Sequence, residues 1–295
     1  MIVVRSCAGF DELEACVQLQ IEVWGYDPSD IIPRKAFLLA QKIGGQVMGA
    51  FDSELADAGG VDQRGAAISH TKGAGVPDAM GATGGTGPTS TAESMVAFAM
   101  SLPAVKTGAD SPDGKPIAYL HSHMLGVREG YRNRGLGARL KLEQRREALA
   151  RGIRYMEWTF DPLEIKNAFL NIHKLGATVC RYRENFYGVS SSRLQGGLPT
   201  DRLVAEWRLD SDRVRAIVEG QAADAPVEVH QIKERVFVPA SIYQWKASAS
   251  DRDKAIAIQL ENRRKFQHAF SHGLAVVGFE CDAEGNGIFE LGKLA

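Results

Sequence analysis

The stretch that most constrains the fold is a strand, a basic turn and a helix in direct succession. Residues 117–127 form an apolar run typical of a strand, and residues 128–134 carry three arginines. From residue 135 to 151 apolar residues share one helical face, namely Leu136, Leu140 and Ala148. A strand that leads through a tight turn into an amphipathic helix predicts an α/β architecture.

The turn itself is suited to bind an anion such as a pyrophosphate. Gly135 and Gly137 stand where the strand becomes the helix, so several backbone N–H groups are uncovered at the positive end of the helix dipole. Either the three arginines of the turn add positive charge at this anion site, or they are solvated surface residues. We therefore predict phosphate contacts from this turn at Arg132, Asn133, Arg134, Gly135, Leu136, Gly137 and Ala138.

Strands and helices alternate over most of the chain, which predicts an α/β fold. Strand-like runs occur at residues 2–4, 44–51, 95–102 and 153–160, and helical patterns at 11–24 and 161–176. In the last of these, Asp161 is expected to cap the helix, with Glu164 placed to reach back to it.

The composition divides the chain into two parts. An acidic and Ala-rich stretch after Leu209 predicts a boundary, with one domain over residues 1–209 and a smaller strand–helix–hairpin extension over 210–295. Within the first part, residues 53–94 are rich in Gly, Ala, Ser and Thr, and we interpret them as a flexible insertion.

Overall composition narrows the classes of function. The formal net charge is -1 with a pI near 6.7, so nothing predicts a nucleic-acid or membrane partner. The four cysteines lack metal-ligand spacing, and no stretch approaches the length of a membrane helix. We expect a cytoplasmic protein without a metal, either a monomer or a homodimer.

Several motifs together resemble the GNAT family of acyltransferases. The pattern Arg132-x-x-Gly135-x-Gly137 is similar to the coenzyme A signature of that family, and A-F-L-N-I-H-K-L-G at 168–176 resembles its later helix. The strings HSHMLGV, EWTFDPLEIKNAF and NFYG resemble a group of predicted acetyltransferases within it. The resemblance covers about residues 1–209. It implies the GNAT fold, which has a mixed central sheet flanked by helices. It also implies acetyl-CoA or another acyl-CoA (succinyl, for example) as co-substrate, and an amine acceptor that is a small molecule such as an amino acid.

The resemblance also implies roles for individual residues. The strand at 117–127 takes the place of the family's fourth strand, so the N–H of Leu125 or Val127 is the expected oxyanion donor. Asn167 and Asn171, four residues apart, are expected on the polar side of their helix, where they contact the pantetheine arm or are solvated.

The expected base is a histidine. His121 and His123 are two residues apart on a strand, so both project from one face, and imidazole titrates near neutral pH. We predict His123 as the base, directly or through water, with His121 behind it; the alternative is a pair of core histidines. Glu157 is a second candidate for the base, or else part of a structural ion pair.

The proton donor for the leaving thiolate is less clearly marked. Ile172 stands where many members of the family have a tyrosine, and an isoleucine cannot donate a proton. Tyr187 is a candidate substitute, and the alternatives are a packing role for Tyr187 and departure of the thiolate without an acid.

Two other functions are open to such a chain. A GNAT-fold module that binds acyl-CoA as a sensor or structural ligand would need the turn but no base. A nucleotide-binding protein would use a similar turn, but no Lys-Ser or Lys-Thr follows the glycines as in a P-loop.

Overall fold

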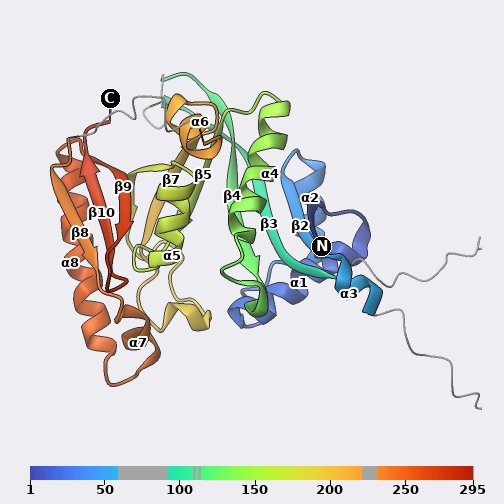
Figure 1. The fold of residues 1–295 in the computed structure, drawn as a ribbon, viewed down its shortest axis with the longest axis horizontal. Coiled ribbons are helices and arrows are strands. Elements are labelled where there is room, and N and C mark those ends of the chain that lie inside the picture. Colours follow the sequence, from blue (N-terminus) through green and yellow to red (C-terminus); the bar gives the residue numbers. More distant parts are fainter. Residues whose placement is uncertain (59–91, 93, 109–110, 112–113, 221–230, 295) are drawn as a thin grey trace, which may run out of the picture.

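The computed structural model describes residues 1–58, 92, 94–108, 111, 114–220 and 231–294. Within these residues one ten-stranded sheet runs through the molecule in the order β1-β2-β3-β4-β5-β7-β6-β9-β10-β8 (Figure 1). The pair β4–β5 is parallel, and the other strand pairs within the described residues are antiparallel. The predicted mixed sheet flanked by helices is therefore confirmed.

In the first half of the sheet, helices cover both faces. α1 and α2 pack on one face around Phe37 and Phe98, and α4 packs on the other around Leu136 and Leu140. The elements are β1 (Ile2–Ser6), α1 (Gly9–Trp24), α2 (Arg34–Lys42), β2 (Gln46–Asp52), α3 (Ser53–Ala58), β3 (Met95–Lys106), β4 (Ile117–Val127), the 3₁₀ turn η2 (Glu129–Tyr131) and α4 (Leu136–Ala150).

The second half continues the same sheet. One hydrophobic core joins Trp158 and Trp207 to Phe266 and Phe289, so the C-terminal helices and strands share the core of β5–β7. The elements are β5 (Tyr155–Phe160), α5 (Ile165–Ala168), the π-helical turn η3 (Phe169–Lys174), β6 (Thr178–Arg183), the 3₁₀ turn η4 (Arg193–Gln195), β7 (Arg202–Arg208), α6 (Asp212–Val218), β8 (Glu234–Val238), α7 (Ile242–Ala247), α8 (Arg252–Ser271), β9 (Ala275–Cys281) and β10 (Gly287–Gly292).

The predicted helix at 161–176 is wrong in its first turn. Asp161 accepts a hydrogen bond from the N–H of Leu163 at 2.8 Å, but α5 begins only at Ile165. Glu164 does not reach back to a cap, because its carboxylate binds Lys246 of α7 at 2.8 Å. The long-range ion pair therefore replaces the local capping box.

The predicted insertion and domain boundary can be compared with the structure only in part. Residues 59–91 and 93 of the predicted insertion lie outside the described residues, while Ser53–Ala58 forms α3 and Ser94 is buried. The extension after residue 209 joins the sheet where Val179 of β6 pairs with Val276 of β9. Whether the two parts fold separately stays a prediction.

The parallel pair in the middle of the sheet opens along its length. β4 and β5 are paired only at Leu120–Met156 and at His121–Glu157. Beyond these pairs β4 follows β3 and β5 follows β7, so the two strands separate toward their C-terminal ends (Figure 1). This separation positions the candidate site, because every predicted catalytic strand residue lies at or beyond it.

Candidate active site

The two predicted histidines lie where β4 and β5 part. In the ladder between β3 and β4, Met100 pairs with Met124 and Ser101 with Ser122, so His123 is the extra residue of a β-bulge. The ring centroids of His121 and His123 are 6.2 Å apart. The structure thus brings these side chains together at the irregular point of the strand.

The N–H groups of Leu125 and Val127 point into the space between β4 and β5. The N–H of Arg128 donates to the carbonyl of Val96 on β3 at 2.9 Å. Because bonds in an antiparallel ladder alternate along the strand, the N–H groups of Val127 and Leu125 face away from β3. They are placed as donors on the side from which β5 has departed.

β4 leads through η2 into the N-terminus of α4. The cap residue Gly135 has φ of +75° and no side chain, and the first helical bond runs from the N–H of Arg139 to the carbonyl of Gly135 at 3.1 Å. The N–H groups of Leu136, Gly137 and Ala138 therefore precede the helical ladder. Asn133 also adopts a left-handed conformation, with φ of +61°, which tightens the turn.

The three arginines of the turn have different surroundings. Arg128 binds Glu22 of α1 at 3.0 Å, so its charge is already paired. Arg132 is exposed and donates through Nε to the carbonyl of Val127 at 3.3 Å, and Arg134 lies over the ring of Tyr131. Arg132 and Arg134 are thus the arginines whose guanidinium groups face solvent beside the helix N-terminus.

Glu157 lies opposite His121, and its carboxylate is surrounded by basic side chains. Its Oε2 is 2.5 Å from Lys106 Nζ and 2.7 Å from Arg181 Nη2, and its Oε1 is 3.8 Å from His121 Nδ1. Burial by itself would raise the pKa of Glu157, but the nearby His121 and the hydrogen-bonded cations Lys106 and Arg181 outweigh it and hold that pKa well below its usual range. Glu157 is therefore a stable carboxylate anion.

His123 has a different electrostatic environment. Burial, followed by the nearby His121, lowers the pKa of His123 below its usual 6.5. The imidazole of His123 is consequently neutral at pH 7, which is the form that accepts a proton.

Two loops meet beside these residues. The α1–α2 loop and the β6–β7 loop are joined because Ser191 donates to Asp30 through Oγ at 2.6 Å and accepts from the N–H of Asp27 at 3.0 Å. On the β6–β7 loop, the hydroxyl of Tyr187 lies 2.9 Å from that of Thr159 on β5. Tyr187 is therefore held next to the C-terminal end of β5, with its side chain partly exposed.

The C-terminal helix α8 anchors the β6–β7 loop, which the sequence did not indicate. Arg263 of α8 binds the fully buried Asp201 with Nε and Nη2, both at 2.9 Å. Asp201 also accepts from the N–H of Asn185 at 2.9 Å, and Gln259 donates to the carbonyl of Pro199 at 2.8 Å. A long-range contact between residues 62 positions apart has no local sequence signal.

The helix after β5 differs from the prediction at its asparagines. Asn167 is exposed, whereas Asn171 is 4% exposed, so the two do not share a polar face. The π-helical turn η3 shifts the helical phase between them. Ile172 is buried, as its place in the apolar stripe predicted.

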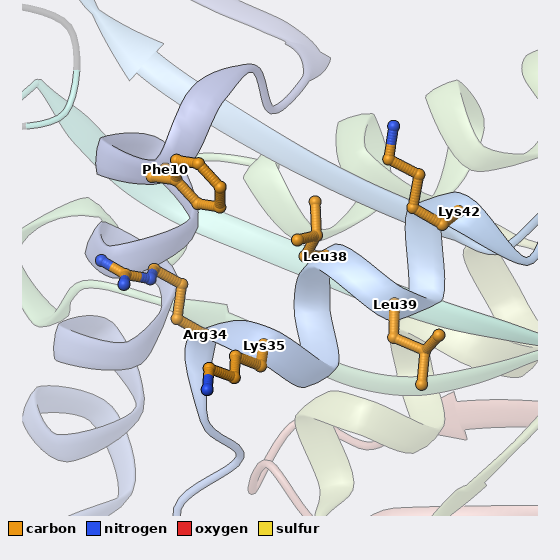
Figure 2. Close-up of a pocket in the computed structure, with 6 residues that line it drawn as sticks. All are labelled: Phe10, Arg34, Lys35, Leu38, Leu39 and Lys42. Carbon is orange, nitrogen blue, oxygen red and sulfur yellow. The ribbon is translucent and has the colours of Figure 1, made fainter.

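A separate hollow lies on the outer surface of α1 and α2. It has a volume of about 500 Å³ and is lined by Phe10, Arg34, Lys35, Leu38, Leu39 and Lys42 (Figure 2). None of these residues belongs to the candidate active site.

No cluster of three or more His, Cys, Asp or Glu side chains in the described ranges could hold a metal ion. No helix of the described chain is both long and apolar enough to cross a membrane.

Comparison with known proteins gives similarity at the level of structure. No family model and no curated protein matches the chain. Solved structures similar to it include the ribosomal-protein-S18-alanine N-acetyltransferase of Escherichia coli, with 15% identity, coverage of 72% of this chain and 96% of the other, and a TM-score of 0.43. Arabidopsis thaliana NAA60 in complex with acetyl-CoA has 13% identity, coverage of 72% and 100%, and a TM-score of 0.48. A GNAT family acetyltransferase from Elizabethkingia anophelis with acetyl-CoA bound has 11% identity, coverage of 70% and 97%, and a TM-score of 0.40. The last of these carries the name of the family that the sequence resembles.

Proposed function

We propose that this chain is an N-acyltransferase that moves an acyl group from acyl-CoA to the amine of a small molecule. The observation that carries the proposal is the course of β4. This strand carries the two histidines, and beyond them its N–H groups face away from β3 on the side from which β5 has separated. It then leads to the N-terminus of α4, where backbone amides have no helical partner. These are the base, the oxyanion donors and the anion site that the reaction needs.

The turn before α4 fits the phosphates of coenzyme A. The N–H groups of Leu136, Gly137 and Ala138 and the left-handed turn at Gly135 would hold the pyrophosphate, with Arg132 and Arg134 adding charge. A side chain at position 137 would shift this turn, since its Cβ would lie 3.2 Å from Leu170 Cδ2. Of the two asparagines, the exposed Asn167 is the proposed contact of the pantetheine arm, because Asn171 is buried.

In the proposed reaction the amine attacks the thioester carbonyl from the side of the histidines. The new C–N bond forms while the carbonyl oxygen becomes an oxyanion, which accepts hydrogen bonds from the N–H of Leu125 or Val127. His123 takes the amine proton, directly or through water. His121 stands behind His123, and the Glu157 carboxylate next to His121 stabilises positive charge on the imidazoles.

The C–S bond then breaks and its electron pair stays on sulfur. Tyr187, whose hydroxyl is ordered by Thr159, is the proposed donor of a proton to the thiolate. The paired loops that carry Ser191 and Asp30 would border the acceptor, so a small amine fits the proposal better than an extended surface of a large partner.

An assay of thiol release tests the proposal. The protein is mixed with acetyl-CoA and a pool of amino acids and simple amines, and free thiol is followed with time. Release that depends on an amine supports the transferase. Binding of acetyl-CoA without release across a broad pool would instead favour a non-catalytic acyl-CoA sensor, a function with which the buried Ile172 is compatible.

A further inference from the structure

A buried lysine lies at the point where β4 and β5 separate. Lys141 of α4 is 3% exposed, and its Nζ donates to Ser122 Oγ at 2.8 Å and lies 3.6 Å from the ring centroid of Trp158. Ser122 and Trp158 each follow the last paired residue of their strand. The amine is therefore at the closed end of the separation, on the side of the sheet that α4 covers.

Lys141 lacks the partners that other buried lysines have. Lys106 lies 2.5 Å from Glu157, and Lys246 lies 3.0 Å from Asp161. Lys141 has no carboxylate within ion-pair distance among the described residues, and burial alone lowers its pKa well below the usual value. Burial therefore favours the neutral amine, and an anion bound beside it would favour the charged form, so the surroundings of Lys141 are electrostatically complementary to an anion.

A second buried donor lies one helical turn away. Gln144 is 0% exposed; its Oε1 accepts from Ser122 Oγ at 3.2 Å, while its Nε2 has no acceptor in the described part of the chain. Exchanging the amide oxygen and nitrogen leaves the deficit in place, because the oxygen would then lack a donor. The side chains of Lys141 and Gln144 thus lie on either side of the Ser122 hydroxyl. Together they present two buried donors, and the described residues supply too few acceptors for them.

We propose that Lys141 and Gln144 bind a carboxylate at the far end of the donor's acyl chain, so the co-substrate is the coenzyme A monothioester of a short dicarboxylic acid. This rests on the proposed function. A carboxylate supplies two acceptor oxygens and a negative charge, which match the two buried donors. The acyl group enters from the face of α4, where the N-terminal turn holds the cofactor phosphates, whereas the acceptor lies on the face of the histidines.

Calorimetry without an amine tests the inference with two matched thioesters, succinyl-CoA and butyryl-CoA. The wild type should bind succinyl-CoA on the order of 10- to 100-fold more tightly, as expected for charge-assisted hydrogen bonds. Lys141→Met should remove this preference and Gln144→Leu should reduce it, while both variants keep their affinity for acetyl-CoA. Lys254→Met, at an exposed lysine of α8, is the control and should keep the preference.

Other outcomes would overturn the inference. Equal binding of the two thioesters by the wild type, as expected if only a water occupies the site, would contradict it and leave the transferase standing. A preference that survives in Lys141→Met would place the carboxylate elsewhere. If Lys141→Met no longer distinguished an amino-acid acceptor from the corresponding decarboxylated amine, the carboxylate bound at this site would be that of the acceptor. Failure of every coenzyme A ester to bind would instead refute the proposed function itself.

Discussion

His121 and Glu157 face each other across the last residue pair of β4 and β5, with Nδ1 3.8 Å from Oε1. The same carboxylate holds Lys106 of β3 and Arg181 of β6, so one buried anion on β5 connects these strands to His121, the residue behind the proposed base His123. This cluster lies at the level where the two strands are last paired.

Replacing Glu157 by Gln should destabilise the fold and slow catalysis. The change leaves Lys106 buried without its counter-charge, which costs about 3 kcal/mol of unfolding free energy. Because the folded-state pKa of Glu157 is lowered, its contribution is present above the unfolded pKa of about 4.3 and is lost as pH falls. Urea unfolding of wild type and variant at pH 7 and pH 3.5 checks this: the gap should narrow at the lower pH.

Glu143→Gln provides the control for that experiment. Glu143 pairs with Arg146 on the surface of α4, so its loss should change stability by less than about 1 kcal/mol. Equal effects of the two substitutions at pH 7 would show that the Glu157 cluster is not a special source of stability.

Replacing His123 by Gln should lower turnover about 100-fold or more while leaving the Kd for acetyl-CoA unchanged. Because burial lowers the pKa of His123, the imidazole is neutral down to below pH 6.5, and wild-type kcat should fall only at more acidic pH. A kcat–pH profile measures this. Unchanged turnover in the variant would show that His123 is not the base but a core histidine.

Replacing Arg263 by Ala should impair the acceptor side without affecting the cofactor. Asp201 would remain fully buried without its cation, at a cost of about 3 kcal/mol, and the β6–β7 loop with Tyr187 would lose its anchor. We expect a raised KM for the amine and an unchanged Kd for acetyl-CoA. Lys265→Ala, at an exposed residue of the same helix, should leave both values as they are; a parallel loss in that variant would point to a general defect of α8.

Replacing Lys141 by Met should raise the melting temperature, since an apolar side chain of similar length replaces an unpaired buried amine. The folded-state pKa of Lys141 is lowered, so the unfolded chain binds more protons and wild-type stability rises as pH increases toward about 10.5. The advantage of the variant should therefore shrink between pH 7 and pH 10. Thermal unfolding of both proteins across this pH range checks the prediction. A variant less stable than the wild type at pH 7 would contradict the account of Lys141 as a buried amine without a counter-charge.

The sequence predicted the local elements of the site better than their assembly. The strand at 117–127 and the helix that starts after Gly135 follow from periodicity and glycine placement, and both are present. The first turn of the helix near Asp161 was wrong because Lys246, far along the chain, takes Glu164. The pairing of β6 with β9 likewise depends on long-range contacts that no local pattern encodes.

The burial of Lys141 was not predicted from the sequence, for a physical reason. Lysine on an amphipathic helix is normally solvated, and the predicted apolar stripe used Leu136, Leu140 and Ala148, which are indeed buried. Only the structure shows that Lys141 and Gln144 are also on the buried face, between α4 and the separating strands. The bulge at His123 was equally invisible, since it arises from the register between β3 and β4.

The measurement that tests the central claim most directly is calorimetric titration of acetyl-CoA into the wild type, Gly137→Val and Ala150→Val. The wild type should bind, and Gly137→Val should weaken binding at least about tenfold because the new side chain would press on Leu170 and Leu125 and displace the turn whose amides hold the pyrophosphate. Ala150→Val, at the exposed far end of α4, should bind like the wild type. No heat of binding from any coenzyme A ester, or equal affinity in Gly137→Val, would contradict the account.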